Sequence, residues 1–234
     1  MNLYLDIETI PDQRPGAMDR VIADLKPPGN IKKAESIDKW WQTKSQEVAD
    51  EAWRKTALDG GRGHVWCICW AIEANHVRVV SQQDQGSERG VLTAFNAALN
   101  DVPIEHVIGH NLRRFDLRFL FHRSAILRTP LPLDVVEAVG ERYSTRVIDT
   151  MEMWSGGGAH DYVSLDALAD MFGIEMKAEI DGSKVWDAIR DGKPELVIEH
   201  CTEDVEVTRA VHQRMVQAMA GKFPAEVDVT DAPF

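Results

Sequence analysis

Four carboxylates and one histidine have the residue types and the spacing that metal-assisted hydrolysis would need. Asp6 and Glu8 stand two positions apart at the end of the apolar run NLYLDIET, so on a strand both side chains point to one side. Asp116 lies in HNLRRFDLRFLFHRS and Asp204 lies in EHCTEDVEVT. His200 precedes Asp204 by four residues, so the two share a face if this stretch is helical. Such a pair is either a general base beside a metal ligand or a polar pair on a solvated helix.

The acids have a second interpretation that spacing alone leaves open. Asp6 and Glu8 repel each other unless a cation lies between them, but they can also mark an exposed strand end. The strand is otherwise apolar and we expect it in the middle of the sheet, which weakens the second interpretation. Taken singly, Asp116 and Asp204 are equally consistent with solvated helical residues.

The order of the expected elements predicts an α/β fold. Apolar alternation predicts strands in NLYLDIET, GRGHVWCICWAI, HVRVVS, HVIGHN and TRVIDT. Helical spacing follows in ERGVLTAFNAALN, in the stretch after HVIGHN, in SLDALADMFG and in the long run after Lys193. The early hairpin implies antiparallel pairing, and the later strand–helix–strand units imply parallel strands. We therefore expect a mixed five-stranded sheet flanked by helices, in one domain over residues 1–222.

Residues 11–63 interrupt this pattern and are expected to form a helical insertion. PDQRPG and KPPGN are loop signals, and residues 34–58 have the pattern of a long helix with Trp41 on its buried side. Lysines interleaved with tryptophans can track a single nucleic acid strand, but an ordinary amphipathic helix has the same pattern. The tail, residues 223–234, is expected to be loose.

Composition and charge narrow the class of protein. The 234 residues carry a formal net charge of -12, so nucleic acid binding requires a local basic track or bound cations. The three cysteines form no C-x-x-C pair, which argues against a zinc site and a disulfide framework and suits a reducing cytoplasm. The opening residues lack the basic start of a signal peptide, and no apolar stretch approaches the length of a membrane span.

Three separated motifs make the chain resemble a known superfamily. YLDIETIPD, GHNLRRFD and HCTEDVEVT, in this order and spacing, resemble the three motifs of the DEDD 3′–5′ exonucleases, which have a ribonuclease H-like fold. The chain is most similar to the stand-alone group related to the exonuclease domains of family-B DNA polymerases. The resemblance covers nearly the whole chain except residues 11–63 and the tail.

The resemblance implies a two-metal site. Asp6, Glu8, Asp116 and Asp204 would be the ligands of two Mg²⁺ or Mn²⁺ ions, and hard oxygen ligands suit these ions. One ion would activate a water molecule and the other would stabilise the leaving 3′-oxygen. Asp149 is a further acid near this set, but with Glu152 three residues later it fits a helix N-cap better.

The substrate-binding residues also follow from the resemblance. Thr9 and Ile10 would line the pocket of the 3′-terminal nucleotide, and Asn111 would help to place that nucleotide, although it could equally cap the following helix. Arg114 is a candidate for phosphate binding, together with its neighbours Arg113 and Arg118. His110 is better explained as a structural histidine.

His200 departs from the superfamily pattern. The third motif has either a tyrosine four residues before the aspartate or a histidine five residues before it, and here a histidine takes the tyrosine spacing. An imidazole with a pKa near 6.5 can accept a proton that a tyrosine cannot. We expect His200 to act as the general base or to position the water, whereas in the alternative it is a surface histidine and the metals act alone.

The predicted activity is removal of nucleoside 5′-monophosphates from the 3′ end of single-stranded DNA. The chain has no room for a polymerase domain, so we expect action in repair, DNA turnover or proofreading in trans, with replication or repair proteins as possible partners and no membrane. An RNA-trimming exonuclease is the alternative within this class. A nucleic-acid-binding module without catalysis is the alternative outside it, and the presence of all four acids argues against that.

Overall fold

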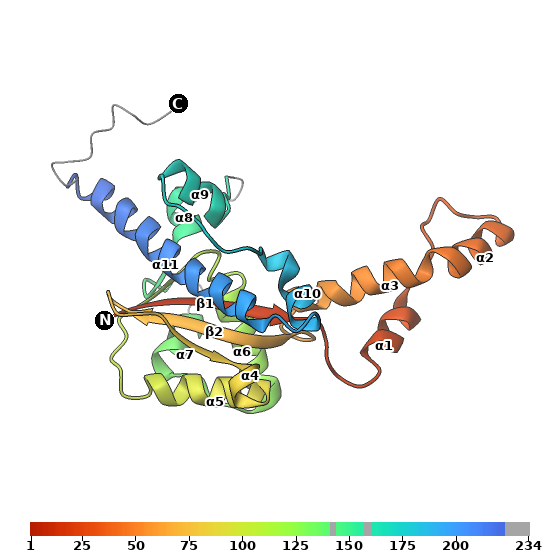
Figure 1. Ribbon diagram of the computed structural model, residues 1–234, viewed down its shortest axis with the longest axis horizontal. Coiled ribbons are helices and arrows are strands. Elements are labelled where there is room, and N and C mark those ends of the chain that lie inside the picture. The colour runs from red at the N-terminus through yellow and green to blue at the C-terminus, as the bar shows by residue number, and fades with distance from the viewer. Residues whose placement is uncertain (141–143, 157–160, 223–234) are drawn as a thin grey trace.

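A five-stranded sheet in the order β3-β2-β1-β4-β5 forms the centre of the molecule (Figure 1). The computed structural model describes residues 1–140, 144–156 and 161–222. The strands are β1 (Asn2–Ile10), β2 (His64–Ile72), β3 (Arg78–Ser81), β4 (His106–Gly109) and β5 (Val147–Asp149). β1 pairs antiparallel with β2 and parallel with β4, and the outer pairs continue these two arrangements. The expected mixed sheet, with β1 in its middle, is confirmed.

Helices surround the sheet on both faces. They are α4 (Gln82–Gln85), α5 (Glu88–Leu99), α6 (Asp116–Leu127), α7 (Leu133–Gly140), α8 (Thr150–Trp154), α9 (Leu165–Met171), the 3-10 turn η2 (Gly182–Lys184), α10 (Val185–Arg190) and α11 (Pro194–Met219). Figure 1 shows α5, α6 and α7 below the sheet and α11 running obliquely across it, and residues of α10 and α11 form the core on the opposite face from α5.

The alternation of side chains along β1 divides the core into two layers. Leu3, Leu5 and Ile7 pack with the helices of one face, including Phe95 of α5. Tyr4 points to the opposite face, where the core contains residues of α10 and α11. Because side chains on a strand alternate, Asp6 and Glu8 also point toward α11. The fold thus directs both acids to one helix.

Capping residues set the local boundaries that the sequence predicted for α9. Ser164 caps the helix by accepting a hydrogen bond from the Ala167 N–H, and Gly173 follows with a φ of 65°. The helix after β4 differs from the prediction, because it begins only at Asp116 and is preceded by a turn. Asn111, at the start of this turn, has a φ of 57°, which is left-handed and cannot continue into a helix.

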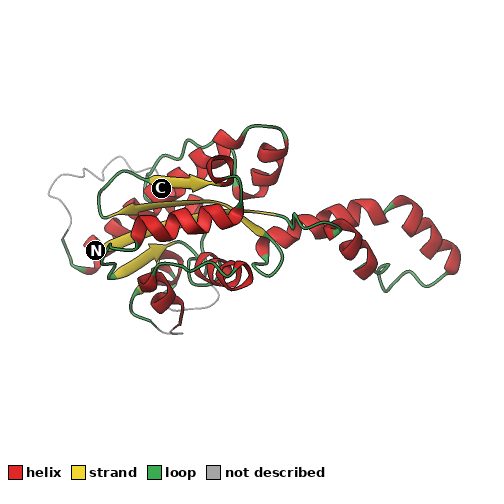
Figure 2. Cartoon of the chain, turned by 90° about the horizontal axis from the view of Figure 1, so that it is seen from below, coloured by secondary structure: helices red, strands yellow, loops and turns green. Residues whose placement is uncertain are grey.

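Residues 11–63, which we call the arm, project from the body at the end of β1 (Figures 1 and 2). The arm contains α1 (Ala17–Asp24), α2 (Ala34–Thr43), α3 (Ser45–Arg54) and the 3-10 turn η1 (Lys55–Leu58). The single long helix expected here is wrong, because Lys44 separates α2 from α3 with a φ of -125°. The side chain buried on α2 is Trp40, whereas Trp41 is 38% exposed. The break explains this difference, since a helical face does not continue in phase across a non-helical residue.

Two further expectations concern the ends and surfaces of the chain. The tail, residues 223–234, lies outside the described residues. The helical spacing of the run after Lys193 predicts Met219 on the buried side of α11, but this side chain is 80% exposed. Within the described residues, no helix is long and apolar enough to cross a membrane.

Candidate active site

Asp6 and Glu8 lie on the central strand, in the stretch that β4 leaves unpaired. The parallel pairing of β1 with β4 ends at Tyr4, while the antiparallel pairing with β2 continues and shifts register between Glu8 and Thr9. Such an irregularity redirects side chains, and it is common beside active sites. In the stretch that carries the two acids, β1 is therefore paired with β2 on one edge only. The other edge of β1, which faces α6, has no strand beside it.

Asp116 closes this open edge. Its Oδ1 accepts a hydrogen bond of 3.2 Å from the N–H of Ile7, the residue between Asp6 and Glu8. The N–H is available because β4 is too short to pair with it, and the first position of α6 supplies the carboxylate. Asp116 is 3% exposed. The structure thus joins the first and second sequence motifs through a backbone contact.

His200 and Asp204 reach the same place from α11. The Nε2 atom of His200 lies 3.2 Å from Oε1 of Glu8, and its Nδ1 lies 3.7 Å from Oδ1 of Asp204. The thiol of Cys201 donates to the carbonyl of Asp6 at 3.7 Å, so α11 lies directly on β1. Ligand atoms of Glu8, His200 and Asp204 lie within 4.8 Å of one another. The predicted sharing of a helix face by His200 and Asp204 therefore holds.

Burial and neighbouring negative charges raise the pKa of all four acids. Burial raises the pKa of Asp6 and Glu8 well above the usual range, and the neighbouring carboxylates raise it further. Asp116 changes in the same direction for the same main reason. Burial, followed by the charges of Asp166 and Glu203, raises the pKa of Asp204 to about 7. Without a positive charge among them, these groups resist ionisation.

The donor atoms fit a divalent cation of the hard type. Oδ2 of Asp6, Oδ1 of Asp204 and Nδ1 of His200 are buried and have no hydrogen-bond partner in the described part of the chain. Buried polar atoms are normally satisfied, and carboxylate oxygens are the ligands that Mg²⁺ and Mn²⁺ prefer. Glu8, Asp204 and His200 therefore form a group that could hold a metal ion. The sequence had suggested His200 only as a general base or as a residue that positions the water.

Asp149 is engaged in holding the local backbone. Its carboxylate accepts hydrogen bonds from the N–H groups of Asn111, Arg113 and Met151, at 3.0, 3.1 and 3.0 Å. It is the N-cap of α8, as the sequence predicted. His110 is likewise structural, with its ring nitrogens bonded to Thr150 and to the Val163 carbonyl.

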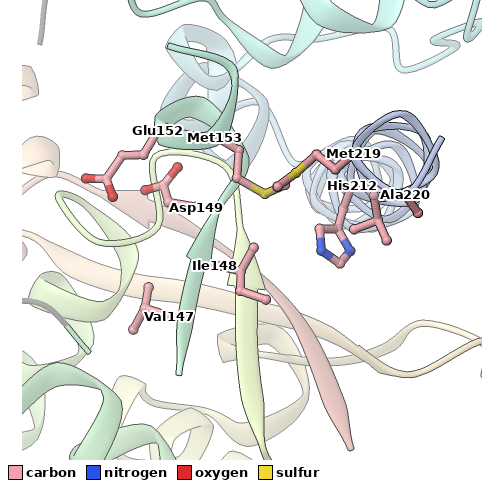
Figure 3. A pocket seen from close by; sticks show the side chains of 9 residues that line it. Val147, Ile148, Asp149, Glu152, Met153, His212, Met219 and Ala220 are labelled. Atoms are coloured by element: carbon pink, nitrogen blue, oxygen red, sulfur yellow. The ribbon is translucent and has the colours of Figure 1, made fainter. Parts of the chain in front are cut away.

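A hollow of about 720 Å³ lies beside Asp149, between β5, α8 and the last turns of α11 (Figure 3). Met153 and Met219 approach each other across it, and His212 points into it from α11. The Nδ1 atom of His212 is 3.1 Å from the hydroxyl of Tyr4. Because the carboxylate of Asp149 is already bonded to three N–H groups, Asp149 does not offer this hollow an unpaired buried oxygen of the kind that Asp6 has.

The residues predicted to bind the nucleotide differ in their burial and in their hydrogen bonds. Thr9 donates its hydroxyl hydrogen to the carbonyl of Ala57 at 2.7 Å. The side chain of Ile10 is 4% exposed and packs in the core. Asn111 does not cap α6, whose N-cap position is Phe115. The roles of Thr9, Ile10 and Asn111 toward a nucleotide stay predictions.

Arg114 is the exposed cation beside the turn that carries Asp116. Its guanidinium lies 4.4 Å from the ring centre of Tyr162 and donates to the Tyr162 hydroxyl. Arg113, by contrast, donates to Glu152 and to the carbonyls of Ser144 and Val147. Arg113 therefore holds β5 to the turn, and the exposed Arg114 and Arg118 stay predictions for phosphate binding.

Two groups near the site were not found by reading the sequence. Tyr162 stands beside Arg114, and Asp166 acts electrostatically on both His200 and Asp204. Asp166, Asp181 and Glu203 line a hollow of about 290 Å³ that reaches His200. No spacing pattern could have indicated them, because they come from separate loops and helices.

The fold is similar to that of part of a solved structure. The chain is similar to the family B DNA polymerase of the hyperthermophilic archaeon Pyrobaculum calidifontis, with a TM-score of 0.61 and 17% sequence identity. The similar region covers 92% of this chain and 24% of the polymerase chain. The chain thus spans about a quarter of that protein, and the likeness is one of fold. No curated protein matches the sequence.

The sequence itself then assigns the chain to a family. The model of a family described as predicted 3′-5′ exonucleases related to the exonuclease domain of PolB matches residues 63–230. Because this match covers most of the chain, the protein belongs to that family, as its motifs indicated. The match includes Asp116 and Asp204 but begins at residue 63, after Asp6, Glu8 and the helices of the arm.

Proposed function

We propose that this protein is a metal-dependent 3′–5′ exonuclease acting on the 3′ end of single-stranded DNA and releasing nucleoside 5′-monophosphates. The observation that carries the proposal is the meeting of Asp6, Glu8, Asp116 and Asp204 from three separate elements. These carboxylates raise one another's pKa, and two of them have unpaired buried oxygens. Such an arrangement is costly unless cations occupy it.

Each acid has a distinct task in this proposal. Asp6, whose Oδ2 is unpaired, would hold both of two Mg²⁺ or Mn²⁺ ions, Glu8 and Asp204 would hold one of them, and Asp116 would help to hold the other. When bound, the ions activate a water molecule and stabilise the charge on the leaving 3′-oxygen. Asp116 also fixes β1 through the Ile7 N–H, so it keeps the acids of β1 at a constant distance from α6.

His200 would accept the proton of the attacking water. Once Glu8 is ionised it can only accept hydrogen bonds, so neutral His200 would carry its proton on Nε2, which lies 3.2 Å from Oε1 of Glu8. Nδ1 is then the basic atom, and it has no hydrogen-bond partner among the described residues. Burial lowers the pKa of His200, which keeps the imidazole neutral and able to accept a proton at physiological pH.

The experiment that tests this function uses one single-stranded oligonucleotide labelled at either end. With Mn²⁺, a 5′ label should yield a ladder that shortens stepwise, whereas a 3′ label should appear at once as a mononucleotide. EDTA should abolish both patterns. A parallel RNA strand of the same sequence distinguishes the two substrates. Internal cuts, shortening from the 5′ end, or no cleavage with either metal would contradict the proposal.

A further inference from the structure

The tip of the arm is basic in a protein that is otherwise strongly acidic. Residues 26–44 contain five lysines and two acids, whereas the whole chain has 26 basic and 38 acidic residues. The arm projects away from the body (Figure 2), so the field of the body's acids is weakened at the tip by distance and by salt. The tip is thus a local positive patch on a chain that repels polyanions overall.

The lysines of the tip are free to contact a partner. Lys26, Lys32, Lys33 and Lys39 are exposed, and in the described part of the chain no carboxylate forms an ion pair with them. Only Lys44 is paired, with Glu47 at 2.8 Å. By contrast, Arg54 and Lys55 nearer the body are paired with Asp50 and Glu51. Positive charge is therefore uncompensated at the tip and compensated toward the body.

The root of the arm contains a hollow of about 350 Å³ next to the candidate active site. It is lined by Thr9 and Pro11 of the chain after Glu8, by Leu58 of η1 and by Trp186 of α10. Leu58 is 65% exposed, and the Trp186 ring stands edge-on to Trp53 of the arm at 5.1 Å. A hollow of this size and mostly apolar lining suits one small ring system.

The hollow is firmly connected to the strand that carries the acids. Thr9, which directly follows Glu8, donates to the Ala57 carbonyl of η1, and Trp53 donates its indole hydrogen to the Asp12 carbonyl at 2.9 Å. Arg54 of α3 binds Asp187 of α10 at 3.0 Å. A strand whose 3′ end lies at Glu8 therefore meets the arm root first and can continue along α3 toward the tip.

We propose that the arm binds the single-stranded nucleic acid that leads to the active site, with a base in the root hollow beside Leu58 and Trp186 and with phosphates on the lysines of the tip. This inference rests on the proposed function, because it requires a strand whose 3′ end lies at the carboxylates. Alternation of an apolar platform with cations is the general means by which proteins hold single strands without reading sequence. The region that the family model matches begins at residue 63, so the match does not include the helices of the arm.

The test measures binding and cleavage separately. Binding of a fluorescent single-stranded oligonucleotide is followed by anisotropy with Ca²⁺ in place of Mg²⁺, with strand integrity verified on a gel. Replacing Lys32, Lys33 and Lys39 together by serine should weaken binding roughly tenfold, because exposed charge contacts contribute modestly each. It should also reduce the salt dependence of log Kd by about 2, since each lost phosphate contact on a single strand contributes about 0.7. Leu58→Ser should weaken binding with no change in the salt dependence.

A matched control variant distinguishes the loss of the tip lysines from a general loss of positive charge. Lys177, Lys193 and Lys222 are exposed lysines of the body, and their joint replacement by serine changes the net charge by the same amount. This control should bind like the wild type. Cleavage of a dinucleotide, which is too short to reach the tip, should be unchanged in the variant of the tip lysines, whereas KM for a long strand should rise.

The possible outcomes distinguish this inference from the proposed function. A wild type that binds the strand but cleaves nothing contradicts the proposed function alone. A tip variant with wild-type affinity and salt dependence, or a control variant that loses as much as the tip variant, overturns the role of the arm. If the tip lysines instead bind the acidic body of a second copy, the variant will abolish a dimer in sedimentation while strand binding is unchanged, which also overturns the inference.

Discussion

At the scale of single residues, His200 is the side chain whose position adds most to the chemistry of the site. Its two ring nitrogens face Glu8 and Asp204, so the imidazole stands between two acids rather than on the surface. The spacing of four residues before Asp204 directs it there, because one residue of shift would turn it by about 100° around the helix. The surface-histidine alternative does not agree with its 7% exposure.

We predict that His200→Ala will lower kcat by roughly a hundredfold, a typical contribution of a general base, and will leave oligonucleotide affinity unchanged. His200→Tyr should retain more activity, because the spacing suits a tyrosine that orients the water. Single-turnover rates measured across pH provide the readout. The wild-type rate should fall as the imidazole becomes protonated, and the tyrosine variant should lack this limb. A wild-type rate in the alanine variant at saturating metal would make His200 a bystander.

At the scale of elements, β1 and α11 hold acids together that repel one another. The folded state raises the pKa of Asp204 to about 7, above the usual value of about 3.9, so the folded protein binds this proton more tightly than the unfolded chain does. This proton makes its full contribution to the free energy of unfolding below about pH 4, and the contribution is lost as the pH rises toward 7. Asp6, Glu8 and Asp116 act in the same direction.

We predict that in EDTA the difference in melting temperature between Asp204→Asn and the wild type will grow as the pH rises from about 4 to about 7. Asp204→Asn should melt several degrees higher than the wild type at the upper end, because it removes a carboxylate whose ionisation the fold opposes. Saturating Mg²⁺ should remove most of the difference, because a ligand that binds only the folded state stabilises it. Thermal unfolding followed by circular dichroism measures all three. A metal-free wild type that keeps the same melting temperature as Asp204→Asn over this range would contradict the close packing of the acids.

The elements with a strong local signal could be predicted from the sequence. β2 and β3 follow the hairpin pattern, and Ser164 with Gly173 marks both ends of α9. The position of β1 in the middle of the sheet followed from its apolar composition. Asp6, Glu8, Asp116 and Asp204 could be grouped because three motifs occur in the order that a known superfamily has.

Features that depend on tertiary contacts could not be predicted. The turn before Asp116 arises where Asn111 and Arg113 donate to Asp149, which is far along the chain. The burial of Trp40 rather than Trp41 depends on the break at Lys44, and nothing in the local residue pattern requires a break there. Tyr162 lies in a loop and Asp166 lies in the first turn of α9, and only the tertiary fold brings them to the site.

At the scale of the whole molecule, net charge and shape explain how an acidic protein could act on a polyanion. The sheet and its helices bring the carboxylates together on the α11 side of β1, and the arm extends from the same end of β1 (Figure 1). Cations at the acids and lysines at the arm tip would each reverse the local sign of the field. The net charge of -12 then limits nonspecific binding elsewhere on the surface.

The central claim is that the four carboxylates, acting through bound metal, carry the cleavage of 3′ ends. The most direct measurement is the initial rate of nucleotide release from a labelled strand in saturating Mn²⁺ for Asp6→Ala, Asp204→Ala and the control Glu206→Ala, which removes an exposed acid of the same helix. We predict that both ligand variants will fold, release no nucleotide above background and bind Mn²⁺ more weakly, while Glu206→Ala will match the wild type. Near-normal release by either folded ligand variant would contradict the account.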